Sequence, residues 1–298
     1  MKFNKPKINT QKTTIQAKSK IQTAMNTTRN KLNMGTFNPD AFTIEHLTIK
    51  DRRIPKKFNN YTLVHLTDIH LGQWINKTKL DGIVQLTNNQ NPDTILLTGD
   101  YLSYQTKNYL KELETSLKKL NPKDKTISVL GNHDHWMDAK KVKEALNNAN
   151  IINLENDVYP LQKQNKTLQI AGVDSNDKYV DRLDVDSITL HKDDIEKVKE
   201  KLEKNTPAIM LAHEPDFADT TSKLPQFILQ LSGHSHGGQI TLPHIGTPIR
   251  GKNFIKYPIG KYQIENLTQY TSRGVGTNAF WIRINCTPEI TKITLKSR

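Results

Sequence analysis

Five short apolar runs in this chain each end on a polar residue of the kind that binds metals. The runs TLVHL, TILL, ISVL, AIMLA and ILQL have the length and apolar character of buried strands. Between these runs, apolar residues at helical spacing predict helices. In one such segment a single face is formed by Leu110, Leu113, Leu117 and Leu120. Alternating strands and helices predict an α/β architecture, in which ligands gather at the carboxyl ends of the strands.

The residues that follow these runs form one candidate metal site. Buried carboxylates and imidazoles are costly to desolvate, so five strand ends that carry them need a physical reason. Imidazole, carboxylate and amide oxygen suit divalent manganese, iron or zinc, and the absence of a thiolate among them argues against a tetrahedral structural zinc. The candidate ligands are Asp68, His70, Asp100, Asn132, His213, His234 and His236.

The spacing of these residues favours two ions over one. His234 and His236 are two positions apart, which places both rings on one side of an extended chain, about 7 Å apart. Asp68 and His70 have the same spacing and can bind a single ion. Asp100 follows a glycine, which lets its backbone approach closely and its carboxylate bridge. Two divalent ions, two carboxylates and a hydroxide leave a net positive charge, which predicts an anionic substrate such as a phosphate ester.

The motifs DIH, GD, GNHD, H and GHSH occur in an order that resembles the calcineurin-like metallophosphoesterase superfamily. The segments LAHEPDFAD, LSGHSHGGQITLP, YTSRGVGTN and PEITKITL are similar to one bacterial branch of it, the YkuE/YaeI-like phosphoesterases. The resemblance covers about residues 43–296. It implies a four-layer α/β/β/α sandwich with a dimetal site at the carboxyl ends of the strands.

The resemblance also implies a division of roles among the site residues. His133 would bind no metal, but would hydrogen-bond the phosphate and protonate the leaving oxygen as the catalytic acid. The ligands would fall into two sets, with Asp68, His70 and His236 on one ion, Asn132, His213 and His234 on the other, and Asp100 bridging.

We therefore expect a metal-dependent phosphoric ester hydrolase. Metal-bound hydroxide would attack a phosphodiester or pyrophosphate bond with the help of two divalent ions, Mn²⁺ being favoured over Fe²⁺ or Zn²⁺. A lipid-linked substrate such as UDP-diacylglucosamine or a phospholipid is one expectation, and a nucleic-acid or nucleotide phosphodiesterase is the alternative. A non-catalytic metal-dependent scaffold is a third hypothesis. A protein phosphatase is disfavoured because the GD motif continues as YLSYQ and lacks the Asp-Arg-Gly continuation of the Ser/Thr protein phosphatases.

Other polar and aromatic residues carry weaker signals. Asp174, Phe280 and Trp281 are candidate substrate contacts, with a turn or simple packing as the competing interpretation. His65 lies in mid-strand and is expected to be a core histidine with a hydrogen-bond partner. His135 is expected to be a partly exposed loop histidine.

The charge of the chain is concentrated near its beginning. The net charge is +13, and residues 1–39 hold eight basic residues and no acidic one. We expect residues 1–40 to be a separate basic leader, either disordered or lying on an anionic membrane surface, and residues 41–298 to be the phosphoesterase domain. The expected location is the cytoplasm, with peripheral attachment to the inner membrane surface as the alternative. No obligate protein partner is inferred, and Cys286 alone allows no internal disulfide.

Overall fold

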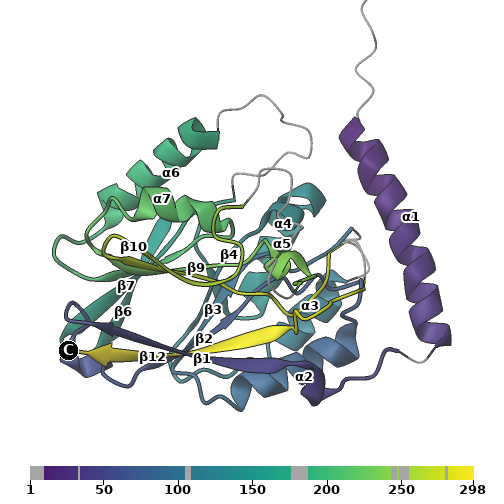
Figure 1. Cartoon of the computed structure of the whole chain (residues 1–298), viewed down its shortest axis with the longest axis horizontal. Coiled ribbons are helices and arrows are strands. Elements are labelled where there is room, and N and C mark those ends of the chain that lie inside the picture. Colours follow the sequence, from purple (N-terminus) through teal and green to yellow (C-terminus); the bar gives the residue numbers. More distant parts are fainter. Residues whose placement is uncertain are drawn as a thin grey trace, which may run out of the picture.

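Two six-stranded sheets pack face to face at the centre of the structure (Figure 1). The first sheet comprises, in spatial order, β1 Thr43–Asp51, β12 Glu289–Ser297, β2 Thr62–Leu66, β3 Thr94–Thr98, β4 Thr126–Val129 and β5 Ile151–Asn153. The second comprises β10 Gly260–Ile264, β11 Leu267–Thr271, β9 Phe227–Ser232, β8 Ala208–Leu211, β7 Lys166–Gly172 and β6 Asp157–Lys163. This computed structural model describes residues 10–32, 34–104, 109–175, 187–242, 247, 255–278 and 281–298.

Parallel pairing dominates the middle of both sheets. Strands β2 to β5 run parallel to one another, as do β7, β8, β9 and β11. The alternating pattern of the last forty residues suggests antiparallel strands, and this expectation holds only in part. The pair β10 and β11 is antiparallel, whereas β12 enters the first sheet, antiparallel to β2 and parallel to β1. Parallel pairing brings the carboxyl ends of β2, β3 and β4 to one edge.

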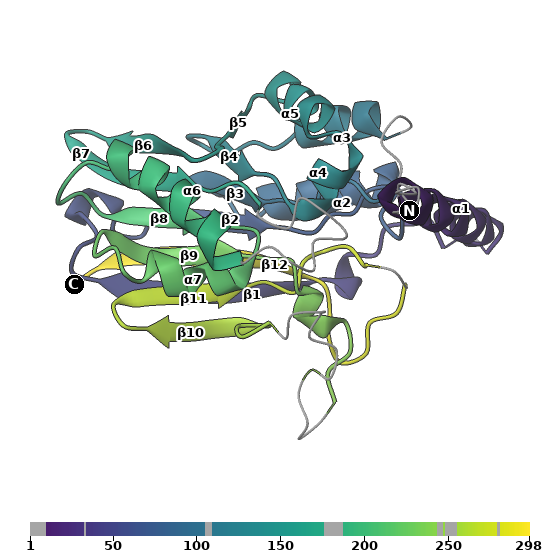
Figure 2. The same ribbon diagram turned by 90° about the horizontal axis from the view of Figure 1, so that it is seen from above.

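Helices cover the outer faces of both sheets, which completes an α/β/β/α sandwich (Figure 2). The first sheet packs against α2 Lys77–Asn88, α3 Leu110–Leu117 and α5 Ala139–Asn148. The second packs against α6 Ser187–Lys201 and α7 Ala218–Thr221. Short helical turns are found at α4 Asn132–Met137 and, as 3-10 helices, at η1 Pro39–Ala41, η2 Lys56–Phe58, η3 Pro215–Phe217 and η4 His236–Gly238.

The apolar strands bury both of their faces because they lie in the two middle layers. In β2, Val64 and Leu66 pack toward the helices, whereas Leu63 joins the cluster between the sheets. The second sheet contributes residues such as Ile209 and Leu229 to the same cluster. Full burial of each such side chain contributes roughly 1.5–3 kcal/mol. This cluster fixes the position of one sheet on the other, and therefore the relative position of their strand ends.

Residues Thr10–Lys31 form helix α1, which lies beside the loops that follow β2 and β3 (Figure 1). Of the two expectations for this part of the chain, disorder does not agree with its helical backbone, and a place on an anionic membrane surface stays a prediction. Gln22, Asn26 and Arg29 are buried although they are polar. Among the described residues, no helix has the length and apolarity of a membrane span. The domain boundary near residue 40 stays a prediction.

His65 lies on the face of β2 that points between the sheets, as a core histidine should. It is fully buried, and its Nε2 lies 2.7 Å from the hydroxyl of Thr98 on the neighbouring strand. Burial lowers the pKa of His65 to about 3. The folded state therefore keeps this ring neutral at pH values where the unfolded chain, with a pKa near 6.5, takes up a proton.

Acidification should destabilise the protein partly through His65. Its contribution is fully present above pH 6.5 and is lost as the pH falls toward 3, because only the unfolded state gains a proton there. Between pH 7 and pH 5 the loss should be about 2 kcal/mol. The variant His65→Gln keeps a hydrogen-bond donor but cannot titrate. When the free energy of unfolding in urea is measured at pH 7 and pH 5, its decrease should be smaller in the variant than in the wild type by about this amount. An equal decrease in both proteins would contradict the prediction.

Candidate metal centre

All seven candidate ligands meet where strands of the two sheets end. The loops after β2, β3 and β4 supply residues from the first sheet, and the loops after β8 and β9 supply residues from the second. His234 is partly exposed and the other candidates are buried. The side chains brought together in this way are Asp68, His70, Asp100, Asn132, His213, His234 and His236.

One group of donor atoms is formed by Asp68, His70 and His236. The Nε2 atoms of the two histidines are 3.0 Å apart, and Nε2 of His236 lies 3.3 Å from Oδ1 of Asp68. One ligand atom from each of the three residues fits within 4.8 Å of the others. The Nδ1 atoms of both histidines are buried without a hydrogen-bond partner among the described residues. Three donors aimed at one point are what a cation requires.

A second group is formed by Asn132, His213 and His234. Oδ1 of Asn132 lies 3.1 Å from Nε2 of His213 and 3.1 Å from Nδ1 of His234. Asp100 lies between the two groups, since its Oδ2 is 3.4 Å from Nε2 of His70 and 3.4 Å from Nε2 of His213. A carboxylate equidistant from one histidine of each group has the position of a bridging ligand.

The backbone is strained where it carries most of these ligands. Five of the seven have positive φ, namely Asp68 at 54°, His70 at 47°, Asp100 at 56°, His234 at 67° and His236 at 52°. Residues other than glycine rarely adopt this left-handed conformation, and each such residue costs on the order of 1 kcal/mol. The turns direct the side chains inward directly after the strands end, which explains how short loops can converge on one small volume.

The electrostatics of the centre suit divalent cations. Burial opposes charge on Asp100, but the imidazoles of His213 and His133 hold the pKa of this carboxyl well below its usual range. Burial also opposes protonation of His213, and Asp100 nonetheless raises its pKa well above the ordinary value. Burial, together with the charge of Asp100, raises the pKa of Asp68. Two buried carboxylates this close need compensating positive charge, and the nitrogen and oxygen donors around them fit divalent metal ions.

Asp134, for which the sequence suggested no role, supports the backbone of the loops that carry the ligands. Its carboxylate accepts hydrogen bonds from the backbone N–H groups of Asp100 at 2.9 Å, Tyr101 at 2.9 Å and Gly131 at 3.0 Å. Burial and the nearby charge of Asp100 raise the pKa of Asp134 to about 7. A Cβ at Gly131 would lie 2.3 Å from Oδ1 of Asp100, so only glycine fits there. The carboxylate thus joins the loops after β3 and β4.

His133 lies at the edge of the centre, in a wall of aromatic rings. Its backbone N–H donates to Oδ1 of Asp100 at 2.9 Å. Its ring centroid is 4.6 Å from that of His70, 5.1 Å from that of Tyr104 and 4.4 Å from that of Trp136. Burial lowers the pKa of His133 well below the ordinary value. Trp136 lies three residues after His133 in the same helix α4, whereas Tyr104 comes from the loop after β3, so only the contact with Tyr104 is invisible in the local sequence.

The weaker candidates have different surroundings. Asp174 is buried, and Nε2 of His135 donates to its Oδ1 at 2.6 Å. His135, expected in a loop, lies in α4 instead, because the turn after β4 continues as helix. The ring of Trp281 lies 5.8 Å from that of Trp74. Phe280 falls outside the described residues. The role of Asp174 and Trp281 as substrate contacts stays a prediction.

Arg283, two residues beyond Trp281, supports the loop behind Asp68. Its guanidinium donates to the backbone carbonyl oxygens of Arg273 at 2.7 Å and Gly276 at 2.5 Å. The N–H of Gly276 in turn donates to the carbonyl oxygen of Asp68 at 2.7 Å. Nothing in the sequence indicated this role for Arg283, because its partners are main-chain atoms of a separate loop.

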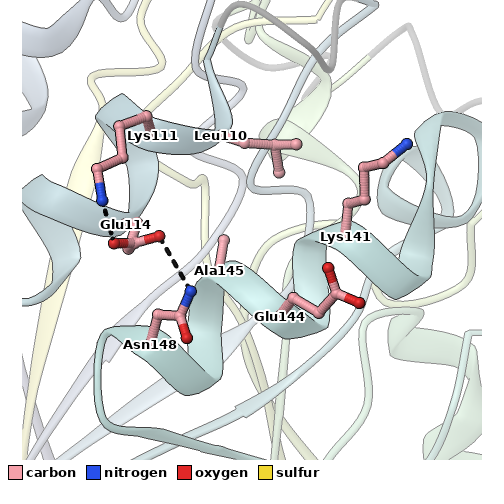
Figure 3. Close-up of a pocket in the computed structure, with 7 residues that line it drawn as sticks. All are labelled: Leu110, Lys111, Glu114, Lys141, Glu144, Ala145 and Asn148. Atoms are coloured by element: carbon pink, nitrogen blue, oxygen red, sulfur yellow. Dashed lines mark hydrogen bonds and ion pairs between the residues drawn. The ribbon is translucent and has the colours of Figure 1, made fainter.

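A cleft between α3 and α5 contains none of these residues (Figure 3). Its rim is charged, and Glu114 in it accepts from Lys111 at 2.6 Å and from Asn148 at 3.2 Å. The lining residues are Leu110, Lys111, Glu114, Lys141, Glu144, Ala145 and Asn148. The carboxylate is already paired within the cleft, which is therefore an ordinary helix–helix groove.

Comparison with known proteins agrees with this geometry. Residues 61–238 match a family described as calcineurin-like phosphoesterase. The chain is 34% identical over 259 residues to the uncharacterized metallophosphoesterase YkuE of Bacillus subtilis, covering 86% of this chain and 85% of that protein. It is 28% identical over 249 residues to the phosphodiesterase YaeI of Escherichia coli, covering 83% and 84%. A transmembrane protein with metallophosphoesterase domain from Danio rerio is 30% identical, covering 82% of this chain and 55% of that protein.

Removal of the Asp134 carboxylate should destabilise the protein strongly. Asp134→Ala leaves three buried N–H groups without acceptors, and each costs roughly 1–3 kcal/mol. The free energy of unfolding in urea should therefore fall by about 3 kcal/mol or more. Asp138→Ala is the matched control, because this nearby carboxylate caps α5 at an exposed position and should cost only about 1 kcal/mol. Equal losses in the two variants would show that Asp134 does not brace the loops.

Proposed function

Because the chain belongs to the calcineurin-like phosphoesterase family and is a metal-dependent phosphoesterase, we propose that it hydrolyses a phosphodiester or pyrophosphate bond with two divalent ions. The observation that carries the proposal is the position of Asp100. Its Oδ2 lies 3.4 Å from a histidine nitrogen of each donor group. A single-ion site has no use for a buried carboxylate shared between two sets of ligands.

In this proposal the donor groups hold one ion each. Asp68, His70 and His236 would bind the first and Asn132, His213 and His234 the second, with Asp100 shared. Nitrogen and oxygen donors without a thiolate suit Mn²⁺, Fe²⁺ or Zn²⁺, of which we propose Mn²⁺. When bound, such ions act as Lewis acids on the phosphate and make a nucleophile available from water at neutral pH.

His133 would act on the leaving group. Its backbone is fixed by the hydrogen bond to Asp100, and a ligand atom of its ring lies within 4.8 Å of those of His70 and Asp100. The pKa of the free ring is low because of burial. A bound phosphate places negative charge beside the ring and raises this pKa, so that the imidazolium can hydrogen-bond the phosphate and protonate the leaving oxygen.

A lipid-linked substrate is the finer part of the proposal. The basic residues of segment 1–39 suit an anionic membrane surface, where each contributes roughly 1 kcal/mol of attraction, and the reaction would take place on its cytoplasmic side. A nucleotide or nucleic-acid substrate is the second candidate, since the net charge of +13 also suits a phosphate backbone. Turnover of a panel of phospholipids, nucleotide-diphosphate lipids and oligonucleotides by the full chain distinguishes the two.

Asp100→Ala should abolish hydrolysis of bis(p-nitrophenyl) phosphate. Loss of the shared carboxylate weakens both ion sites at once, so the metal content of the purified protein should fall together with activity. Asp81→Ala, which removes a carboxylate on α2 that pairs with Lys77, should leave both unchanged. Metal analysis and turnover are measured on the same preparations. Full activity in Asp100→Ala would rule out the two-ion proposal.

His133→Ala should separate catalysis from metal binding. The variant should keep its metal content and lose about 10²–10⁴-fold in kcat, most severely for esters with poor leaving groups that need a proton. A series of aryl phosphodiesters of increasing leaving-group pKa measures this dependence. Loss of metal in step with activity would instead make His133 a ligand.

A further inference from the structure

One face of helix α1 is turned toward the loops that carry the metal ligands. Gln22, Asn26 and Arg29 recur at helical spacing and are buried. The side-chain amide of Asn26 donates to the carbonyl oxygen of Gly72 at 2.7 Å. The amide of Gln22 donates to the same oxygen, and the guanidinium of Arg29 donates to the carbonyl oxygen of Gln73. These carbonyls follow His70 by two and three residues. These hydrogen bonds hold α1 against the loop that follows His70.

Lys18 lies one turn before Gln22 on the same face. Its Nζ is 5.0 Å from the ring centroid of Tyr104, and that ring is 5.1 Å from the ring of His133. The side-chain oxygen of Gln22 accepts from the N–H of Tyr104 at 3.0 Å, which fixes the tyrosine against the helix. The ammonium of Lys18 thus neighbours the phenol ring of Tyr104, which in turn neighbours the imidazole of His133.

The position of this ammonium matters because of the role proposed for His133. If His133 protonates the leaving oxygen, then Lys18 lies on the side from which the leaving group departs. A cation there attracts a leaving group that carries its own negative charge and is indifferent to a neutral one. Over about 10 Å in a partly buried site, one charge is worth roughly a factor of ten in rate or affinity.

We propose that Lys18 is a specificity-determining residue that selects substrates whose leaving group bears a phosphate, that is, pyrophosphate bonds over simple diesters. This inference rests on the proposed function. In the reaction, the oxygen of water bonds to one phosphorus and the bridging oxygen departs with the other phosphate. The leaving phosphate keeps the electron pair of the broken P–O bond, and the protons of water pass to the products. Lys18 attracts the negative charge that the departing phosphate carries before the bond breaks, a charge that the aryl group of a simple diester lacks.

Two substrates and three variants test the inference. The full-length, Mn²⁺-loaded protein is assayed with UDP-glucose, whose pyrophosphate bond gives two phosphate products, and with bis(p-nitrophenyl) phosphate. Lys18→Met keeps the apolar stem over Tyr104 and removes the charge. It should lower kcat/KM for UDP-glucose roughly tenfold and change that for the diester less than about twofold. Lys18→Arg should restore the preference. Lys20→Met, an exposed position on the same helix, should change neither value.

The outcomes separate this inference from the proposed function. A wild-type protein inactive on both substrates overturns both. A wild-type protein that hydrolyses the diester but not UDP-glucose leaves the phosphoesterase function standing and overturns the role of Lys18. The same holds if Lys18→Met lowers both activities equally, which would mean that Lys18 only holds α1 in place. Loss of the effect on raising the salt concentration from 0.05 to about 0.5 M supports the role, because charge attraction is screened there.

Discussion

The shared, buried carboxylate of Asp100 is the interaction on which the centre of this molecule depends. It lies at the end of β3, 3.4 Å from one histidine of each donor group, in surroundings that exclude water. Burial of a carboxylate has a large desolvation cost, and several neighbouring groups offset this cost. The imidazole of His213 favours the ionised carboxylate, and the backbone N–H of His133 donates a hydrogen bond to it. Asp134 holds the main chain of Asp100 through a further hydrogen bond. Only a backbone without a side chain, at Gly131, leaves room for it.

The same constraint explains why two sheets are needed. The loops of the first sheet carry both carboxylates, whereas those of the second supply three of the histidines. The two meet where Nδ1 of His213 lies 2.6 Å from the carbonyl oxygen of Thr98, the last residue of β3. The apolar cluster between the sheets therefore matters for the chemistry, because each donor group draws ligands from both sheets. A shift of one sheet by a single residue would move the ligands within each group apart by about 3 Å.

The sequence predicted the architecture well because its signals are local. An apolar run followed by a polar ligand is visible within about ten residues, and the fold class, the family and the strand ends follow from repetition of that pattern. The supports of the site are not local. Asp134 and Arg283 act on backbone atoms of distant loops, and Tyr104 meets His133 only in three dimensions. Helix α1 was missed for a related reason, since its buried face is polar and gives no apolar periodicity.

The left-handed turns that carry five of the ligands link metal supply to the persistence of the fold. Their strain adds up to several kcal/mol that the rest of the chain must offset. A ligand that binds only the folded state adds RT ln(1 + [L]/Kd) to its stability, about 2.7 kcal/mol at a hundredfold excess over Kd. Cells that run short of the ion would therefore lose molecules of this protein to unfolding and proteolysis as well as losing turnover. The abundance of the protein in the cell would then follow the supply of the ion.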